Sequence, residues 1–218
     1  TESLNAKKAR IHYEIIVSDT VLVTYGHKDV VLDMKREDTV KGVTKIPYEN
    51  LWSVDNPLRY RLNLKTQIEG RYVEYQTHML GFRDLAYENG ALYVNGIKTE
   101  PNFKDVDART VTDKDIVAAR AAKYNGVRFL NAAVPYELYR MCDSLGMYVS
   151  VAVPINTRNS GASRRVGGNE SNNREWRESF VQRAENSFYT TRNYACVVEY
   201  TLANESSNGI NLYESYLR

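Results

Sequence analysis

The chain has 218 residues, enough for one large domain or two small ones at roughly 100 to 200 residues per domain. A complete eight-stranded α/β barrel takes about 250 residues and does not fit. Lys and Arg number 29 and Asp and Glu number 27, and the resulting net charge of +2 is too small to support nucleic-acid binding. We therefore expect no nucleic-acid partner. No apolar run approaches about 18 residues, so we expect no membrane span.

The first 82 residues show the pattern of an antiparallel β domain. Short β-branched or aromatic runs alternate with turn formers such as Gly26 and Gly42, and no helical period lies between them. Five to seven short strands at this spacing predict an antiparallel sandwich. The predicted strands include residues 10–17, 20–25, 30–34, 58–64 and 72–77. Strict alternation in one of them should bury one face, which carries Leu58, Tyr60, Leu62 and Leu64.

After residue 110 the pattern changes to alternating helices and strands. Thr112 can cap a helix whose third position is Asp115 and which ends before Gly126, and a second helix ends at Gly146. Alternating helices and apolar strands predict a parallel sheet with right-handed crossovers. The predicted strands are 127–130, 147–153 and 195–202, and the predicted helices begin near residues 112, 136 and 174. We place the domain boundary at Phe82, which gives domains 1–82 and 83–218.

The numbers and positions of five residue types are informative. The 17 tyrosines against five phenylalanines suit either β-sheet surfaces or sugar-stacking platforms, and the sheet role is the commoner one. All three histidines fall in the first 80 residues, so the rest of the chain has no imidazole for a metal or a proton shuttle, and we expect neither a metal site nor a cofactor. Packing roles are expected for both cysteines, as buried thiols, and for both tryptophans: Cys142, Cys196, Trp52 and Trp176.

Several segments, taken in order, resemble glycoside hydrolase family 2, which contains β-galactosidases, β-glucuronidases and β-mannosidases. Each is weak alone, but their common order and spacing are specific. The resemblance implies an immunoglobulin-like β-sandwich followed by the N-terminal half of a (β/α)8 barrel, a multidomain β plus α/β fold. The segments are Leu51 to Pro57, Gly81-Phe82-Arg83, Tyr93 to Gly96, Asn125 to Arg128, Cys142 to Val149, Arg192-Asn193 and Tyr200 to Ser206.

The resemblance also implies a site. In the family an Asn-Glu pair ends the fourth barrel strand, so Glu205 would be the general acid/base of a retaining reaction and Asn204 would bind the sugar 2-hydroxyl group. Arg128 matches the arginine of the family's Arg-x-Ser-His pattern, and Asn131 stands at its histidine position. Both are candidate substrate-binding residues for an oligosaccharide or glycan. Without the family context, an Asn-Glu dipeptide is more typical of a solvated loop.

Other positions depart from the family pattern. The family nucleophile comes from the seventh barrel strand, which would lie beyond Arg218. Family acidic and histidine positions are replaced near Asn156, Arg158 and Tyr194-Ala195. We therefore expect the substrate and magnesium contacts of those side chains to be missing. A glycine-rich basic stretch over residues 161–168 is expected to form a loop over the barrel mouth.

Two functional hypotheses follow. In the first, the chain is a fragment of a β-galactosidase-like hydrolase in carbohydrate degradation, incomplete as a catalyst by itself. In the second, it is a catalytically degenerate homologue that binds a carbohydrate or a protein. The sandwich is expected to be a structural spacer. The family resemblance alone suggests a secreted or periplasmic protein, and the open edges of half a barrel suggest self-association.

Overall fold

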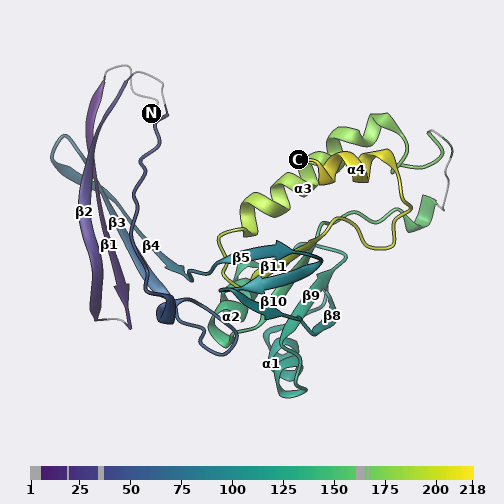
Figure 1. Cartoon of the computed structure of the whole chain (residues 1–218). Helices are drawn as coiled ribbons and strands as arrows, with labels where there is room; N and C mark the ends of the chain where they lie inside the picture. Colours follow the sequence, from purple (N-terminus) through teal and green to yellow (C-terminus); the bar gives the residue numbers. More distant parts are fainter. Residues whose placement is uncertain (1–5, 19, 34–36, 161–164, 166) are drawn as a thin grey trace. The chain divides into compact units, whose positions relative to one another are not determined.

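A computed structural model describes residues 6–18, 20–33, 37–160, 165 and 167–218. The chain divides into two compact units (Figure 1). Unit 1 comprises Thr1–Leu51 and Leu58–Phe82, and unit 2 comprises Trp52–Pro57 and Arg83–Arg218. The sequence did not indicate that the short segment Trp52–Pro57 belongs to unit 2. It does so because the Trp52 side chain is fully buried there and its indole Nε1–H donates to the carbonyl oxygen of Asp143 at 2.8 Å.

Unit 1 is built on one antiparallel sheet. Its strands lie in the order β2-β1-β3-β4. The expected strands 20–25 and 30–34 form a single strand, and Gly26 lies within it instead of forming a turn. Glycine is needed there because the ring of Tyr13 lies close to the backbone: a Cβ atom at Gly26 would stand 2.7 Å from Oη of Tyr13. The antiparallel pattern is as predicted, but the described residues of this unit form one sheet and not two. The strands are β1 (Lys7–Val17), β2 (Val21–Leu32), β3 (Tyr60–Ile68) and β4 (Arg71–Leu80), and a 3-10 turn, η1, covers Tyr48–Asn50.

One face of this sheet is apolar and only partly covered. Tyr60 is buried as predicted, whereas Leu58, Leu62 and Leu64 are half-buried. A cavity of about 800 Å³ lies between this face and the segment 38–44. Because only a few apolar side chains of this unit are fully buried, its sheet has a small core. The buried hydrophobic residues in its described part are Ala9, Ile15 and Tyr60.

Unit 2 contains a four-stranded parallel sheet in the order β11-β10-β9-β8. This is the predicted alternation of helices and strands. Outside the prediction lie strand β8, helix α4, which packs against α3 (Figure 1), and a small antiparallel sheet of β5, β6 and β7. The bounds are β5 (Leu85–Glu88), β6 (Ala91–Val94), β7 (Ile97–Thr99), β8 (Phe103–Asp107), α1 (Asp113–Ala121), β9 (Gly126–Leu130), α2 (Tyr136–Leu145), β10 (Tyr148–Ala152), η2 (Arg158–Ser160), η3 (Arg174–Trp176), α3 (Arg177–Thr191), β11 (Val197–Thr201) and α4 (Ile210–Tyr216).

The start of α1 and the end of α2 follow the predicted local chemistry, whereas α1 ends at Ala121 and Gly126, which was expected to stop it, begins β9. The backbone N–H and the hydroxyl group of Thr112 both donate to Oδ2 of Asp115, each at 2.8 Å, at the start of α1. Gly146 ends α2 in the left-handed conformation, with φ at 67°. A Cβ atom at Gly146 would stand 2.3 Å from the carbonyl oxygen of Val54, so this close approach also requires glycine.

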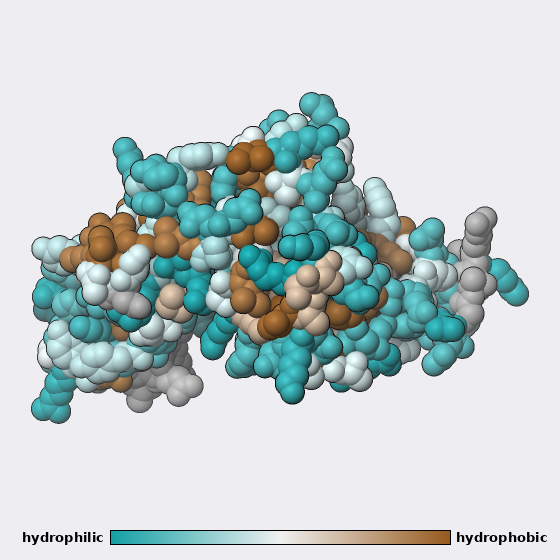
Figure 2. Space-filling model, turned by 90° about the horizontal axis from the view of Figure 1, so that it is seen from below, coloured by the Kyte–Doolittle hydropathy of each residue, from teal (hydrophilic) through white to brown (hydrophobic). Residues whose placement is uncertain are grey.

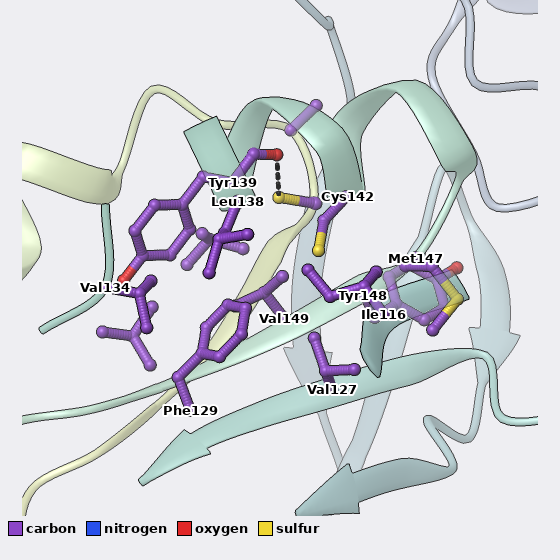
Figure 3. Packing of buried hydrophobic residues seen from close by; sticks show 14 of the residues in the cluster. Ile116, Val127, Phe129, Val134, Leu138, Tyr139, Cys142, Met147, Tyr148 and Val149 are labelled. Carbon is purple, nitrogen blue, oxygen red and sulfur yellow. Dashed lines mark hydrogen bonds between the residues drawn. The ribbon is translucent and has the colours of Figure 1, made fainter. Parts of the chain in front are cut away.

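The main core of unit 2 lies between the sheet and the helices α1 and α2 (Figure 3). Phe129 of β9 packs edge-on against Tyr139 of α2, with ring centroids 5.6 Å apart. Cys142 and Cys196 are fully buried free thiols, as predicted, and burial raises the pKa of both.

Of the two tryptophans, Trp52 has the predicted packing role, but the prediction for Trp176 is wrong. Trp176 is 43% exposed. It lies in the 3-10 turn η3, so the four-residue spacing that buries Phe180 and Ala184 in α3 does not extend back to it.

Candidate functional site

The candidate site lies where the parallel strands of unit 2 end. Residues that follow β8, β9, β10 and β11 in the chain line one polar pocket of about 480 Å³. The carboxyl ends of parallel strands meet at one edge of a sheet, which is why segments so far apart in the sequence converge here. The lining residues are Arg109, Asn131, Asn156, Arg158, Asn159 and Glu205.

Glu205 is held by two side chains from the segment after β10. Nη1 of Arg158 donates to its Oε1 at 2.8 Å, and Nδ2 of Asn156 donates to its Oε2 at 3.3 Å. The Glu205 side chain is 45% exposed, so water screens this ion pair and its contribution to stability is small. The two contacts instead fix the orientation of the carboxylate. The Glu205 backbone is in the left-handed region, with φ at 50°, which is uncommon for a residue other than glycine.

Asn204 and Asn131 contact each other directly. Nδ2 of Asn204 donates to Oδ1 of Asn131 at 2.7 Å, and the backbone N–H of Asn204 donates to the carbonyl oxygen of Ile155 at 3.0 Å. Asn131 also has a left-handed backbone, with φ at 76°. Such outliers gather at functional sites. The structure therefore brings three of the four predicted site residues, Glu205, Asn204 and Asn131, to one place.

Arg128, the fourth predicted residue, lies elsewhere. It stands in the middle of β9 on the face opposite to the core, and it does not line the pocket. Its guanidinium donates to Asp105 at 3.1 Å and to Glu199 at 3.4 Å, and it lies 5.2 Å from the ring centroid of Phe103. These contacts with strands β8 and β11 join the sheet across its width. Its predicted role in substrate binding stays a prediction.

Sequence reasoning did not name Arg109 as a site residue. It follows β8, and its Nε donates to Oδ1 of Asp107 at 2.9 Å. Hydrogen bonds from the side chain and the backbone of Arg109 hold the pKa of Asp107 well below its ordinary value. A hydrogen bond with Asn131 acts in the same direction. The available signal was its position directly after a strand, but β8 itself was not recognised from the sequence.

Asn156 and Arg158 were noted only as replacements of family residues. The structure shows what they do in place of those residues, since both bind the Glu205 carboxylate. Two guanidinium groups line the pocket beside a single carboxylate, and both oxygens of that carboxylate already accept hydrogen bonds, so the pocket does not fit the magnesium ion of the family. Among the described residues, no three His, Cys, Asp or Glu side chains lie close enough together to hold a metal ion.

Two further observations concern the surroundings of the site. Residues 161–164 and 166 of the predicted loop lie outside the described residues, while Asn169 and Ser171, which follow them, are buried.

Within the described ranges, no helix is both long and apolar enough to cross a membrane.

Solved structures of other proteins share the fold of this chain. A β-glucuronidase from Bacteroides uniformis aligns with a TM-score of 0.74 at 15% identity, covering 91% of this chain and 24% of that one. A glycosyl hydrolase family 2 member from Bacteroides cellulosilyticus aligns with a TM-score of 0.71 at 19% identity, covering 91% of this chain and 27% of that one. At such identities the likeness shows a common fold only.

The chain is also similar in sequence to β-galactosidases. The β-galactosidase large subunit of Lactobacillus acidophilus is 29% identical over 230 residues, which cover 97% of this chain and 35% of that protein. The β-galactosidase of Staphylococcus xylosus is 28% identical over 203 residues, with 83% and 20% covered. The chain thus spans about a third or less of the length of these relatives.

Family models match nearly the whole chain. The model of the glycosyl hydrolases family 2 TIM barrel domain matches residues 89–216, more than half of the chain, and a second glycosyl hydrolases family 2 model matches residues 1–83. The parallel β/α units of unit 2 are accordingly part of a TIM barrel, and the antiparallel sheet of unit 1 belongs to the domain that precedes it. The chain is a member of glycoside hydrolase family 2.

Proposed function

We propose that this chain is the part of a β-galactosidase-like retaining glycosidase that carries the acid/base carboxylate, Glu205. The observation that carries the proposal is the place and orientation of Glu205. It follows β11 at the carboxyl edge of the sheet, it is the only carboxylate that lines the described pocket, and Arg158 and Asn156 fix its two oxygens. Catalytic residues of barrel enzymes lie at this edge.

The arrangement suits one half of a double displacement. In the first step Glu205 would donate its proton to the leaving glycosidic oxygen, and in the second step the resulting carboxylate would take a proton from the attacking water. The amide of Asn204 uses one N–H on Asn131, which leaves its second N–H and its Oδ1 for a sugar hydroxyl group. The substrate is then a glycan.

The other half of the reaction needs a second carboxylate. Retaining enzymes place their nucleophile about 5–5.5 Å from the acid/base group. The family nucleophile belongs to a later barrel strand, so we expect it from outside these 218 residues. The chain by itself is then inactive as a glycosidase.

The test is Glu205→Gln in the complete natural protein. Hydrolysis of a β-galactoside with a poor leaving group should slow by about 10²- to 10⁴-fold, because that leaving group needs a proton. A dinitrophenyl galactoside needs little protonation, so its glycosyl-enzyme formation should slow much less. Glu170→Gln is the matched control, because Asn169-Glu170-Ser171 repeats the tripeptide Asn204-Glu205-Ser206 but Glu170 does not line the pocket.

Equal activity of the Glu205 variant and the natural protein on the poor substrate would refute the acid/base role. Equal losses in the Glu205 and Glu170 variants would instead indicate a folding defect.

A second candidate function is binding without cleavage. It is favoured by the ion pair of Arg158 with Glu205, which already occupies the carboxylate. This alternative predicts that a glycan binds the complete protein equally well with Glu205 or with Gln at this position, and that no panel glycoside is hydrolysed. Isothermal titration calorimetry and a hydrolysis assay on the same samples separate the two candidates.

Two further expectations accompany the proposal. The outer edges of β8 and β11 pair with no further strand among the described residues, which supports self-association of the isolated chain. Sedimentation velocity over a range of concentrations measures it, and a purely monomeric chain would contradict it.

A glycan-degrading role also agrees with a secreted or periplasmic location, which cell fractionation would test.

A further inference from the structure

A row of aromatic side chains crosses one face of the sheet in unit 1. The rings of His12 and His27 have centroids 5.8 Å apart, and the rings of His12 and Tyr72 are separated by the same distance. Tyr72 and Tyr75 follow, again with centroids 5.8 Å apart and with ring planes only 30° from parallel. The four rings come from strands β2, β1 and β4 and form a continuous row.

The strand register shows which face of the sheet this is. His12 lies opposite His27 on one side and opposite Lys65 on the other, and Lys65 lies opposite Tyr75. Side chains alternate along a strand, so this face is opposite to the one that carries Ile11 and Leu64. Tyr25 belongs to the same face, since it lies opposite Glu14. We call this surface, defined by His12, Tyr25, His27, Tyr72 and Tyr75, the aromatic face.

The rings of the aromatic face are exposed. Tyr25, Tyr72 and Tyr75 are 73%, 50% and 66% exposed. Aromatic pairs between strands stabilise sheets, but such packing buries ring surface against a neighbour. Here most of the tyrosine surface remains in contact with water, which costs free energy unless a partner covers it.

Polar side chains form a connected chain beside the rings. The hydroxyl group of Thr77 donates to Oδ1 of Asn63 at 2.8 Å, and Nδ2 of Asn63 donates to Oε1 of Glu14 at 2.8 Å. Glu14, Asn63, His12, Tyr25 and Tyr72 border a shallow depression of about 170 Å³, together with Tyr13, Gly26 and Lys65. Exposed ring faces and hydrogen-bonding groups therefore meet in one small area.

This combination matches the chemistry of a sugar ring. A pyranose has C–H faces that pack on aromatic rings and hydroxyl groups at its edge that need amide or carboxylate partners. We propose that the aromatic face binds a neutral oligosaccharide, at a site separate from the pocket of Glu205. The proposal does not depend on the proposed hydrolytic function.

Charge argues against nucleic acid as the occupant. Arg10, on the same face, donates to Asp29 at 2.6 Å and 2.9 Å, and Lys65, which borders the depression, is accompanied there by the carboxylate of Glu14, so the face carries no excess of positive charge. Nucleic-acid binding depends on unpaired basic side chains that replace counterions at phosphates. The bases of a single-stranded oligonucleotide would also stack on these rings. Binding of such an oligonucleotide would therefore overturn the proposal.

The first test uses the unmodified full chain and its three histidines. Imidazole signals in a ¹H–¹⁵N NMR spectrum are recorded while neutral oligosaccharides, such as galacto-, gluco- and manno-oligosaccharides, are added one at a time. At least one of them should shift the signals of His12 and His27. His78 is the internal control, because it lies opposite Leu62 on the other face and its signal should not move.

The second test compares variants by isothermal titration calorimetry with that same oligosaccharide. Tyr72→Ala combined with Tyr75→Ala should weaken binding at least tenfold, while Tyr72→Phe combined with Tyr75→Phe keeps the rings and should retain most of it. Tyr87→Ala is the matched control, since Tyr87 is a strand tyrosine of unit 2 that is even more exposed, at 76%. Glu205→Gln should leave binding at the aromatic face unchanged, which separates this site from the proposed active site.

Several results would overturn the proposal. One is the absence of binding by every oligosaccharide in the panel at millimolar concentration. Another is binding that leaves the His12 and His27 signals unchanged, or that the double alanine variant and Tyr87→Ala weaken equally. Binding of an oligonucleotide in place of any sugar would assign the face to a different ligand. If the double alanine variant does not fold, the NMR titration of the unmodified chain decides alone.

Discussion

Strands β10 and β4 differ completely in burial, and the difference separates the two units. Every residue of β10 is buried, whereas β4 is exposed along its whole length except for half-buried Leu80. β10 lies in the middle of a parallel sheet with helices packed on one face. β4 is the edge strand of a sheet with one face toward solvent. Strand geometry is thus common to both, but apolar burial is concentrated in unit 2.

The surface reflects the same contrast. Figure 2 shows hydrophobic side chains that break a mostly hydrophilic surface in several places. The exposed hydrophobic residues of unit 1 include Val21, Leu22 and Val73. Buried apolar area is the dominant favourable contribution to folding, so we expect unit 2 to be the more stable unit and unit 1 to depend more on hydrogen bonds and cross-strand pairs.

The largest expected effect is that of Phe129→Ala in unit 2. Phe129 is 1% exposed and packs on Tyr139, so its removal leaves a cavity and should lower the free energy of unfolding by about 3–5 kcal/mol. Both tryptophans belong to unit 2, so tryptophan fluorescence during urea unfolding reports this unit specifically. A loss below about 1 kcal/mol would mean that the core of unit 2 is not the main source of its stability.

A smaller effect is expected for Gly209→Ala, between β11 and α4. A Cβ atom at Gly209 would stand 2.2 Å from the carbonyl oxygen of Ser171, so one of the two backbone segments must move. Overpacking of this kind costs about 1–3 kcal/mol. Gly42→Ala in unit 1 is the control, because, apart from its own two chain neighbours, no described residue has an atom within 4 Å of the added Cβ. Equal urea midpoints for the two variants would contradict the contact of Gly209 with Ser171.

Tyr75→Ala on β4 should have the smallest effect on stability of the three. The ring is 66% exposed and contacts Tyr72, so its loss should cost at most about 1 kcal/mol. Unit 1 contains no tryptophan, so the signals of its three histidines in NMR spectra serve as the probe. A cost as large as that of Phe129→Ala would remove the contrast between the two units.

The difference between the units also explains what the sequence could predict. Thr112 and Asp115 act through each other and the left-handed turn at Gly146 is local, so the start of α1 and the end of α2 were readable directly, whereas the close approach of Val54 to Gly146 was not. The burial of Trp176 was predicted wrongly because the sequence did not show that this residue lies in the 3-10 turn η3 and not in the helix α3. The single sheet of unit 1 was not foreseen because alternation within a strand reveals two faces but not what covers each of them.

The same limit applies to the site. The family resemblance identified Glu205 and Asn204, and it also pointed to Asn131, which stands at a histidine position of the family pattern. The partners of Glu205 could not be read from the sequence, because Arg158 is 47 residues away and reaches it only through the convergence of strand ends. Arg109 was missed for the same reason, since β8 carries alternating charges and does not resemble a buried strand.

The last prediction concerns pH and the half-buried carboxylate of Asp107, which ends β8. Hydrogen bonds from Arg109 lower the pKa of Asp107, so the charged form is favoured in the folded chain. The stabilisation from this pair is complete above the ordinary pKa of aspartate and is lost only as the pH falls through the lowered value.

Carboxyl ¹³C NMR should therefore show Asp107 still ionised at pH 3.5. Arg109→Gln should raise its pKa toward the ordinary value, while Asp115, whose pKa is lowered by Thr112, should titrate unchanged. If Asp107 titrates identically in both proteins, its ion pair with Arg109 is not formed in solution, and the polar edge of unit 2 is less ordered than its core.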